Sequence, residues 1–168
     1  MLIDNDYMKI ALEEAQKALE IDEVPVGAVV VLSHRIIGRA HNSPITGHDP
    51  SAHAEILALR QAAKSSGNYR LTGAELYVTL EPCIMCAGAI IQARLARVIF
   101  GALDPKCGAV ASLYQVLSDN RLNHQVTVTG GILKEECGEI ISRFFREKRV
   151  ASARFGEASK CGEVPKWS

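Results

Sequence analysis

The chain has 168 residues, 48% of them hydrophobic, and its 19 basic and 19 acidic side chains give a formal net charge of zero. This length fits one domain with a buried core, and the balanced charge excludes overall basicity as a sign of nucleic-acid binding. No segment approaches the roughly 18 apolar residues that a membrane span needs, and the N-terminus does not resemble a secretory signal, so we expect a cytoplasmic protein with no membrane partner.

The hydrophobic pattern predicts helices and strands in alternation. Polar segments rich in Gly, Pro, Ser and Asn separate these elements. In chain order we expect a helix, two strands forming a hairpin, a helix, a strand, a helix, a strand, a short helix, a strand and a final helix at residues 8–19, 26–32, 35–41, 52–64, 74–80, 83–93, 97–102, 112–118, 125–131 and 134–149. Because the later strand-helix-strand units need crossovers on the faces of the sheet, this order implies an α/β fold with a mixed sheet between helices.

The two ends of the chain differ in charge. Residues 1–26 carry two basic and seven acidic side chains, whereas residues 139–168 carry seven basic and four acidic ones. A basic end suits RNA, although the solvated face of a last helix explains four of its residues equally well: Arg143, Arg146, Lys148 and Arg149. We expect one domain over residues 1–150 and a flexible tail over residues 151–168.

Two expected helix starts carry the residue types of a metal site. "HAE", residues 53–55, and "EPCIMC", residues 81–86, each lie where a helix follows a loop. Helix N-termini are partly positive, so two helices that start at the carboxyl ends of neighbouring strands would form one electropositive pocket in which both cysteines ionise readily. Thiolates and imidazole are the ligands that zinc prefers. His53, Cys83 and Cys86 would leave one tetrahedral position open, as in a catalytic zinc site.

Each of these residues also has an alternative explanation. A Cys-x-x-Cys pair can be a redox pair, and His53 alone can be an ordinary helix-start residue. The five cysteines, an odd number, do not suggest a secreted disulfide scaffold. A closed structural zinc site would need a second close pair, but Cys107, Cys137 and Cys161 are scattered, and only Cys107 remains a candidate fourth ligand. The combination is more specific, because His-x-Glu followed after 26 residues by Pro-Cys-x-x-Cys is a signature of zinc nucleobase deaminases.

Glu55 lies in the first turn of the expected helix, two residues beyond His53. From there its carboxylate can reach a metal-activated water without binding the metal, accept a proton, and return it as an exocyclic amine leaves the substrate as ammonia. The alternative is a solvated Glu that the helix dipole favours at this position.

From about Tyr7 to Arg149 the sequence resembles the bacterial tRNA adenosine deaminases of the TadA family, within the cytidine deaminase superfamily. The matching segments are "EVPVGA", "AHN", "HDPSAHAEI", "NYRL", "LYVTLEPCIMCAGA", "RVIFGA", "DPKCGA", "NH" and "FFREKR". The resemblance implies a cytidine-deaminase-like three-layer α/β/α fold with a five-stranded mixed sheet, formed by a zinc-dependent deaminase domain over residues 1–150. It also implies one Zn²⁺ per subunit, a homodimer with active sites near the subunit interface, and conversion of adenosine to inosine at the wobble position of a tRNA anticodon.

The resemblance further implies a set of substrate-binding residues. Asn42 would contact the purine, the Ala54 backbone would help to read the purine edge, and Val26 would pack against the purine face. Four other residues match positions near the bound anticodon stem-loop: Asp104, Lys106, Phe145 and Arg149. An Asn side chain offers a donor and an acceptor to a base edge, although an Asn before Ser-Pro also suits a turn. Phe145 and Arg149 lie four residues apart on one helix face that could stack a base and hold a phosphate, but a core aromatic beside a surface Arg is the commoner arrangement.

Two other functions use the same motifs. A free-base or nucleotide deaminase of the guanine or cytidine type would share the zinc site and differ in its substrate loops. A zinc-stabilised RNA-binding domain without enzymatic activity would instead use Cys107 to close the coordination shell. The segments "HDPSAHAE" and "MCAGA", together with the half of the chain from "DPKCGA" to "FFREKR", favour tRNA as the substrate.

Overall fold

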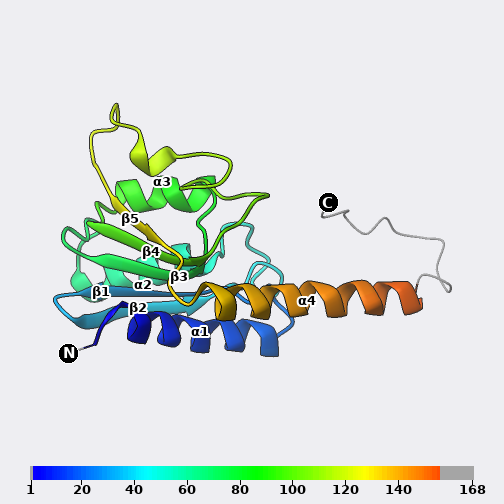
Figure 1. Cartoon of the computed structure of the whole chain (residues 1–168). Helices are drawn as coiled ribbons and strands as arrows, with labels where there is room; N and C mark the ends of the chain where they lie inside the picture. Colours follow the sequence, from blue (N-terminus) through cyan, green and yellow to red (C-terminus); the bar gives the residue numbers. More distant parts are fainter. Residues whose placement is uncertain (1, 156–168) are drawn as a thin grey trace.

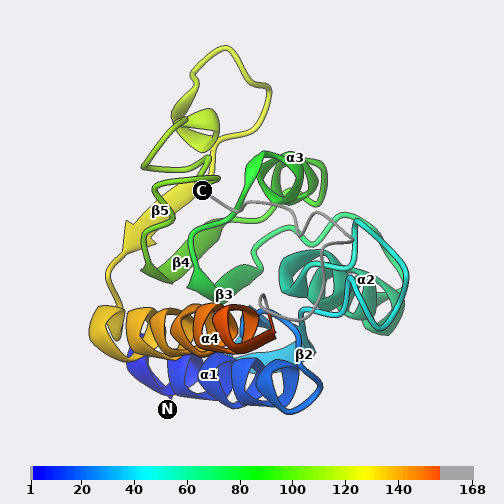
Figure 2. The same cartoon turned by 90° about the vertical axis from the view of Figure 1, so that its right-hand side faces the viewer.

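The computed structural model describes residues 2–155 and has one five-stranded mixed sheet between two layers of helices (Figure 1). The helices α2 and α3 cover one face of the sheet, and α1 and α4 lie side by side on the other (Figure 2). This arrangement confirms the predicted three-layer α/β/α fold. The elements are α1 (Asp4–Glu20), β1 (Gly27–Leu32), β2 (Arg35–His41), α2 (Ala54–Ser66), β3 (Glu75–Leu80), α3 (Ile84–Gln92), β4 (Arg97–Ala102), the 3-10 turn η1 (Val116–Ser118), β5 (Thr127–Gly130) and α4 (Lys134–Phe155).

The strand order is β2-β1-β3-β4-β5. β1 pairs antiparallel with both β2 and β3, whereas β3, β4 and β5 are parallel to one another. Therefore β2 and β3 point the same way, and their carboxyl ends lie at the same edge of the sheet, where α2 and α3 begin. The expectation that these two helices follow neighbouring strands is wrong, because β1 lies between β2 and β3.

Both faces of the sheet are buried, which explains the nearly continuous apolar runs of the central strands. Successive side chains along a strand point to opposite faces. Val78 therefore belongs to the cluster beneath α2 and α3, and its neighbour Tyr77 belongs to the cluster beneath α1 and α4. The first cluster includes Ala54 and Ala58 of α2, so the helix that carries the His-x-Glu motif is fixed to the sheet by apolar packing.

The last helix is longer than predicted. α4 ends at Phe155 rather than Arg149, so the boundary expected at residue 150 falls inside the helix. Residues 150–155 contain no Gly or Pro that would stop a helix, and Gly follows at position 156. The rest of the expected tail, with Cys161 and Trp167, lies outside the described residues. Neither α4, at 22 residues, nor any other helix within residues 2–155 is long and apolar enough to cross a membrane.

Candidate active site

His53, Cys83 and Cys86 meet at the starts of α2 and α3. The Nδ1 atom of His53 lies 3.6 Å from the Sγ atom of Cys83 and 3.6 Å from the Sγ atom of Cys86. His53 and Cys83 occupy the positions immediately before the two helices, both in extended conformation, and Cys86 lies in the first turn of α3. The structure thus brings together three residues from two separate parts of the sequence, residue 53 and residues 83–86.

The spacing of these three side chains suits a tetrahedral zinc ion. Zinc lies about 2.3 Å from a thiolate sulfur and about 2.1 Å from a histidine nitrogen, so two such ligands of one tetrahedral ion are about 3.6 Å apart. The three ligand atoms all lie within 4.8 Å of one another, and within residues 2–155 no fourth His, Cys, Asp or Glu joins the group. Cys107 is exposed and stays outside this group. A group of three ligands has the composition of a catalytic rather than a structural zinc site.

The two thiols of the group differ in acidity. A hydrogen bond with Cys86 lowers the pKa of Cys83 to about 4, with a further contribution from His53. The same contact with Cys83, together with burial, raises the pKa of Cys86. The hydrogen bond between the two thiols therefore favours one thiolate shared by the pair when only the protein's own groups are considered. A coordinated metal cation deprotonates thiols outright, so the pair still suits a metal.

Glu55 is a buried carboxyl group beside these ligands. Its residue is only 4% exposed, so the alternative of a solvated helix-start Glu does not hold. Burial raises the pKa of Glu55 to about 7, although the nearby His53 opposes the shift. A carboxyl group whose pKa lies near neutrality can both accept and return a proton, which suits general acid–base catalysis.

Asn42, Ala54 and Val26 are linked by hydrogen bonds, and Ala54 directly follows His53. The Asn42 side-chain oxygen accepts a hydrogen bond of 2.9 Å from the Ala54 N–H, and the Asn42 N–H donates to the Val26 carbonyl at 3.1 Å. Asn42 is buried, at 8% exposed. Since its oxygen is already engaged, the Asn42 amide group is left with donors to offer a partner.

Asp104 and Lys106 lie in the segment after β4, which we name loop 103–112. The Asp104 carboxylate accepts N–H bonds from Lys106 and Cys107, at 3.0 and 3.2 Å, and so closes a turn. Lys106 is exposed. The loop runs beside the segment that carries Cys83 and Cys86, because Gly108 forms an isolated β-bridge with Cys83.

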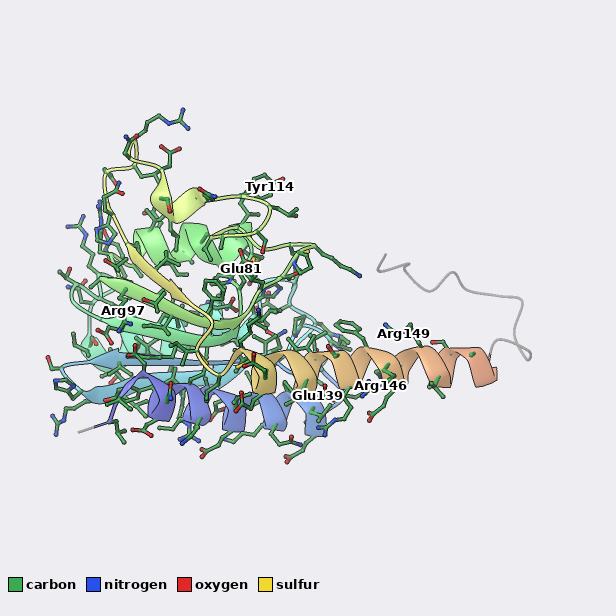
Figure 3. The ribbon with its side chains drawn as sticks, in the orientation of Figure 1. Glu81, Arg97, Tyr114, Glu139, Arg146 and Arg149 are labelled. Atoms are coloured by element: carbon green, nitrogen blue, oxygen red, sulfur yellow. The ribbon has the colours of Figure 1, made fainter. Side chains whose placement is uncertain are left out.

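Phe145 and Arg149 lie on α4, which extends past the sheet on the side where loop 103–112 and the loop before α2 lie (Figures 1 and 2). Phe145 is half-buried and packs edge-on against Phe144, with ring centroids 5.3 Å apart. Arg149 is exposed, as is Arg146 on the same helix (Figure 3). The helix therefore presents guanidinium groups to solvent beside a partly accessible aromatic ring.

Two buried carboxylates that the sequence analysis did not single out hold the loops around the site. Glu23, 1% exposed, accepts hydrogen bonds from the N–H and hydroxyl of Thr46, at 2.7 and 3.0 Å, and so anchors the loop before α2. Glu81, 2% exposed, accepts several bonds from loop 103–112. Burial alone would raise the pKa of Glu81, but these hydrogen bonds outweigh it and hold the pKa below its usual value. The position of Glu81 directly after an apolar strand is the one feature of the sequence that could have indicated a buried acidic residue here.

Known proteins are similar in sequence to this chain over most of its length. A family model for MafB19-like deaminases matches residues 3–149. A tRNA-specific adenosine deaminase of Bacillus subtilis (strain 168) is 52% identical over 149 residues, which are 89% of this chain and 92% of the relative. A tRNA-specific adenosine deaminase of Haemophilus influenzae is 51% identical over 147 residues, 87% of this chain and 85% of the relative.

Solved structures give the same fold. A tRNA:A34 deaminase, studied for A-to-I editing at the wobble position of transfer RNA, superposes with a TM-score of 0.78 and 48% identity over 80% of this chain and 98% of its own. A guanine deaminase from Nitrosomonas europaea superposes with a TM-score of 0.75, but it is only 22% identical over 86% of this chain and 85% of its own. The second likeness extends to the fold alone.

Proposed function

Because this chain belongs to the MafB19-like deaminases and to the tRNA-specific adenosine deaminases, we propose that it converts the wobble adenosine of a tRNA anticodon to inosine. The observation that carries the proposal is the group of His53, Cys83 and Cys86 beside buried Glu55, found in a chain about half identical to tRNA-specific deaminases. The reaction consumes one water and releases ammonia, with a C–O bond formed and the exocyclic C–N bond broken at the same ring carbon.

We propose that the metal is zinc, one ion per chain, held by His53, Cys83 and Cys86. When bound there, zinc would lower the pKa of a water molecule and so supply a nucleophile at neutral pH. Glu55 would accept a proton, pass it to the ring nitrogen, and then help the amine to leave as ammonia. The burial of Glu55 supports this role, because a carboxyl group shielded from bulk water exchanges its proton with the substrate rather than with solvent.

The substrate would be held in two parts. Asn42, with Ala54 and Val26, would hold the purine, and the free amide donors of Asn42 support a contact to a purine acceptor. Four further residues would hold the flanking nucleotides, as the resemblance to the tRNA adenosine deaminases implies: Asp104, Lys106, Phe145 and Arg149. Anticodon loops suit this arrangement, because their bases are partly unstacked and cost less to extrude than bases in a duplex.

The guanine-deaminase alternative has weaker support. The same three-layer fold occurs in a guanine deaminase at 22% identity, whereas identity to the tRNA-specific enzymes is 52% and 51%. The likeness to the guanine deaminase extends to the fold alone, whereas the higher identity to the tRNA-specific enzymes spans 89% and 87% of this chain.

We also propose that two copies associate near the active site and that the protein acts in the cytoplasm, where it would meet tRNA. Exposed apolar side chains near the metal-binding segment support a contact with a second copy: Ile84, at 59%, and Met85, at 37%. Light scattering tests this directly, since a molecular mass of one chain at micromolar concentration would contradict the dimer.

The activity test uses an anticodon stem-loop whose first anticodon base is adenosine, with free guanine in a parallel reaction. We expect inosine and ammonia from the stem-loop and little product from guanine. Glu55→Gln should keep its metal and lose about 10²- to 10⁴-fold in rate, because proton transfer is lost while the ligands stay. Glu14→Gln serves as control, since Glu14 is a buried carboxylate of α1 that pairs with Lys17, Arg39 and His41 and with none of the proposed metal ligands. Rapid guanine deamination with an untouched stem-loop would contradict the tRNA assignment.

A further inference from the structure

Glu81 lies at the centre of a set of hydrogen bonds, and the proposed reaction and substrate contacts give this residue no role. It follows β3 directly and lies two residues before Cys83. Figure 3 shows Glu81 inside the molecule, below the segment that carries Tyr114. All of its side-chain partners belong to loop 103–112: the N–H groups of Asp104 (2.9 Å), Val110 (3.2 Å), Ala111 (2.8 Å) and Ser112 (2.8 Å), and the Ser112 hydroxyl.

The two carboxylate oxygens hold different parts of the loop. Oε1 accepts the three consecutive N–H groups of residues 110–112, and Oε2 accepts the Asp104 N–H and the Ser112 hydroxyl. One side chain therefore joins the beginning of the loop to its end. The loop wraps closely around this carboxylate, because a Cβ atom at Gly108 would lie 2.3 Å from it. A buried carboxylate with this many donors is well satisfied, and losing it would leave several N–H groups without a partner.

The metal ligands are not among the hydrogen-bond partners of this side chain. The Glu81 N–H donates to the Ala102 carbonyl at 2.9 Å, and the Ala109 N–H donates to the Pro82 carbonyl at 2.9 Å. Cys86 is fixed within α3. The Ala109 contact and the Gly108–Cys83 bridge come from loop 103–112 itself, so the carboxylate of Glu81 acts directly on the loop and reaches the cysteines only through these backbone contacts.

We propose that Glu81 is a positioning residue for RNA, which pre-organises loop 103–112 so that the loop can hold the nucleotides that flank the target base. The inference rests on the proposed function. Its physical basis is that a loop already ordered before binding does not lose conformational entropy on binding, so the RNA binds more tightly. The loop carries exposed Lys106 and lies beside Cys83, which is where flanking nucleotides would pass.

Glu81→Gln tests this with the smallest change of shape. The amide oxygen can still accept the three N–H groups of residues 110–112, but the amide nitrogen then faces the Asp104 N–H, and two donors cannot bond. We expect amide exchange, followed by NMR, to become faster at Asp104 and to change little at Ala111. Metal content should equal that of the wild type, and kcat should stay within about twofold, while KM rises about five- to tenfold because the loop must be ordered on binding.

Asp4→Asn is the matched control. The Asp4 carboxylate also accepts several bonds, from the Tyr77 hydroxyl (2.9 Å) and from two nitrogens of Arg97 (3.0 and 2.6 Å). It acts at the amino-terminal end of β4, where Figure 3 places Arg97, away from loop 103–112. The control should lose stability without a change in Kd. Binding is measured on a Glu55→Gln background, so that the stem-loop is not consumed.

Three outcomes would overturn the proposal: equal Kd values for the Glu81→Gln and Asp4→Asn proteins, an Asp104 amide that stays protected, or a loss of metal in Glu81→Gln. If Glu81→Gln does not fold, Ser112→Ala removes only the hydroxyl contact and should raise Kd about twofold, and an unchanged Kd would again refute the role. A wild-type protein that does not bind the stem-loop would contradict the proposed function, whereas amide exchange would still decide whether Glu81 orders the loop.

Discussion

Gly38→Ala should damage the active site from a distance, because α2 packs directly on β2 at this glycine. A Cβ atom at position 38 would lie 2.3 Å from the Ala58 carbonyl oxygen and 2.9 Å from the Ala62 nitrogen. Both are backbone atoms of α2, so no side-chain rotation relieves the contact. The helix must move away from the sheet, and it carries His53 and Glu55 at its start.

The size of the effect follows from these distances. Ordinary van der Waals contact begins at about 3.4 Å, so the helix must shift by about 1 Å near Ala58. Overpacking of this kind costs about 1–3 kcal/mol of unfolding free energy. Misplacing catalytic groups by about 1 Å can cost about 100-fold in rate. Ala58 lies about one turn from Glu55, so most of the shift should reach the site, and we expect kcat/KM to fall about 10- to 100-fold.

The assay measures kcat/KM on the anticodon stem-loop and the free energy of unfolding by urea denaturation. Gly130→Ala is the control, because Gly130 lies on β5, at the opposite edge of the sheet from β2, and its Cβ would lie 2.5 Å from the ring of Phe100 on β4. The control should lose comparable stability and keep kcat/KM within about threefold. A Gly38→Ala protein as active as the wild type, or an equal loss of activity in both variants, would refute the reasoning.

Three further predictions concern the metal, the RNA and acid. Each of three variants replaces one proposed ligand: His53→Ala, Cys83→Ser and Cys86→Ser. Each should lower the metal content, measured by mass spectrometry, well below one ion per chain and should weaken the fold. An unchanged metal content in all three variants would exclude this group as the metal site. Arg149→Ala and Phe145→Ala should weaken RNA binding with the metal content unchanged, and the Arg149 variant should also reduce the salt dependence; unchanged affinity in both would leave them without an RNA role. The hydrogen bond from Arg97 lowers the pKa of Asp4, so Asp4 stabilises the fold above its ordinary unfolded pKa of about 4 and loses this contribution as the pH falls through the folded pKa. Denaturation at several pH values should give the wild type a free energy of unfolding about 1 kcal/mol higher than that of Asp4→Asn near neutrality, and a smaller difference at acid pH. A difference that stays constant with pH would contradict this account.

The sequence predicted the parts of the fold that depend on local pattern. Short apolar runs between turn residues located every strand among the described residues, helical spacing located every α-helix, and the need for crossovers predicted the three layers. The position of β1 between β2 and β3 was not predictable in the same way, since it depends on which strands pair, and pairing partners far apart in the sequence leave no local mark. The end of α4 was missed for another reason, because residues 150–155 neither favour nor forbid a helix strongly.

Some residues of the site could likewise be predicted from the sequence and others could not, and the reason is chemical. A metal accepts few ligand types, so the grouping of His53, Cys83 and Cys86 at helix starts could be predicted from residue type and spacing. A loop, by contrast, can be held by any buried acceptor of the right length. The local sequence around Glu81 does not indicate that its hydrogen-bond partners lie 23 to 31 residues later in the chain. The residues that shape the substrate loops are therefore the ones that need a structure, and they are where tests of specificity should begin.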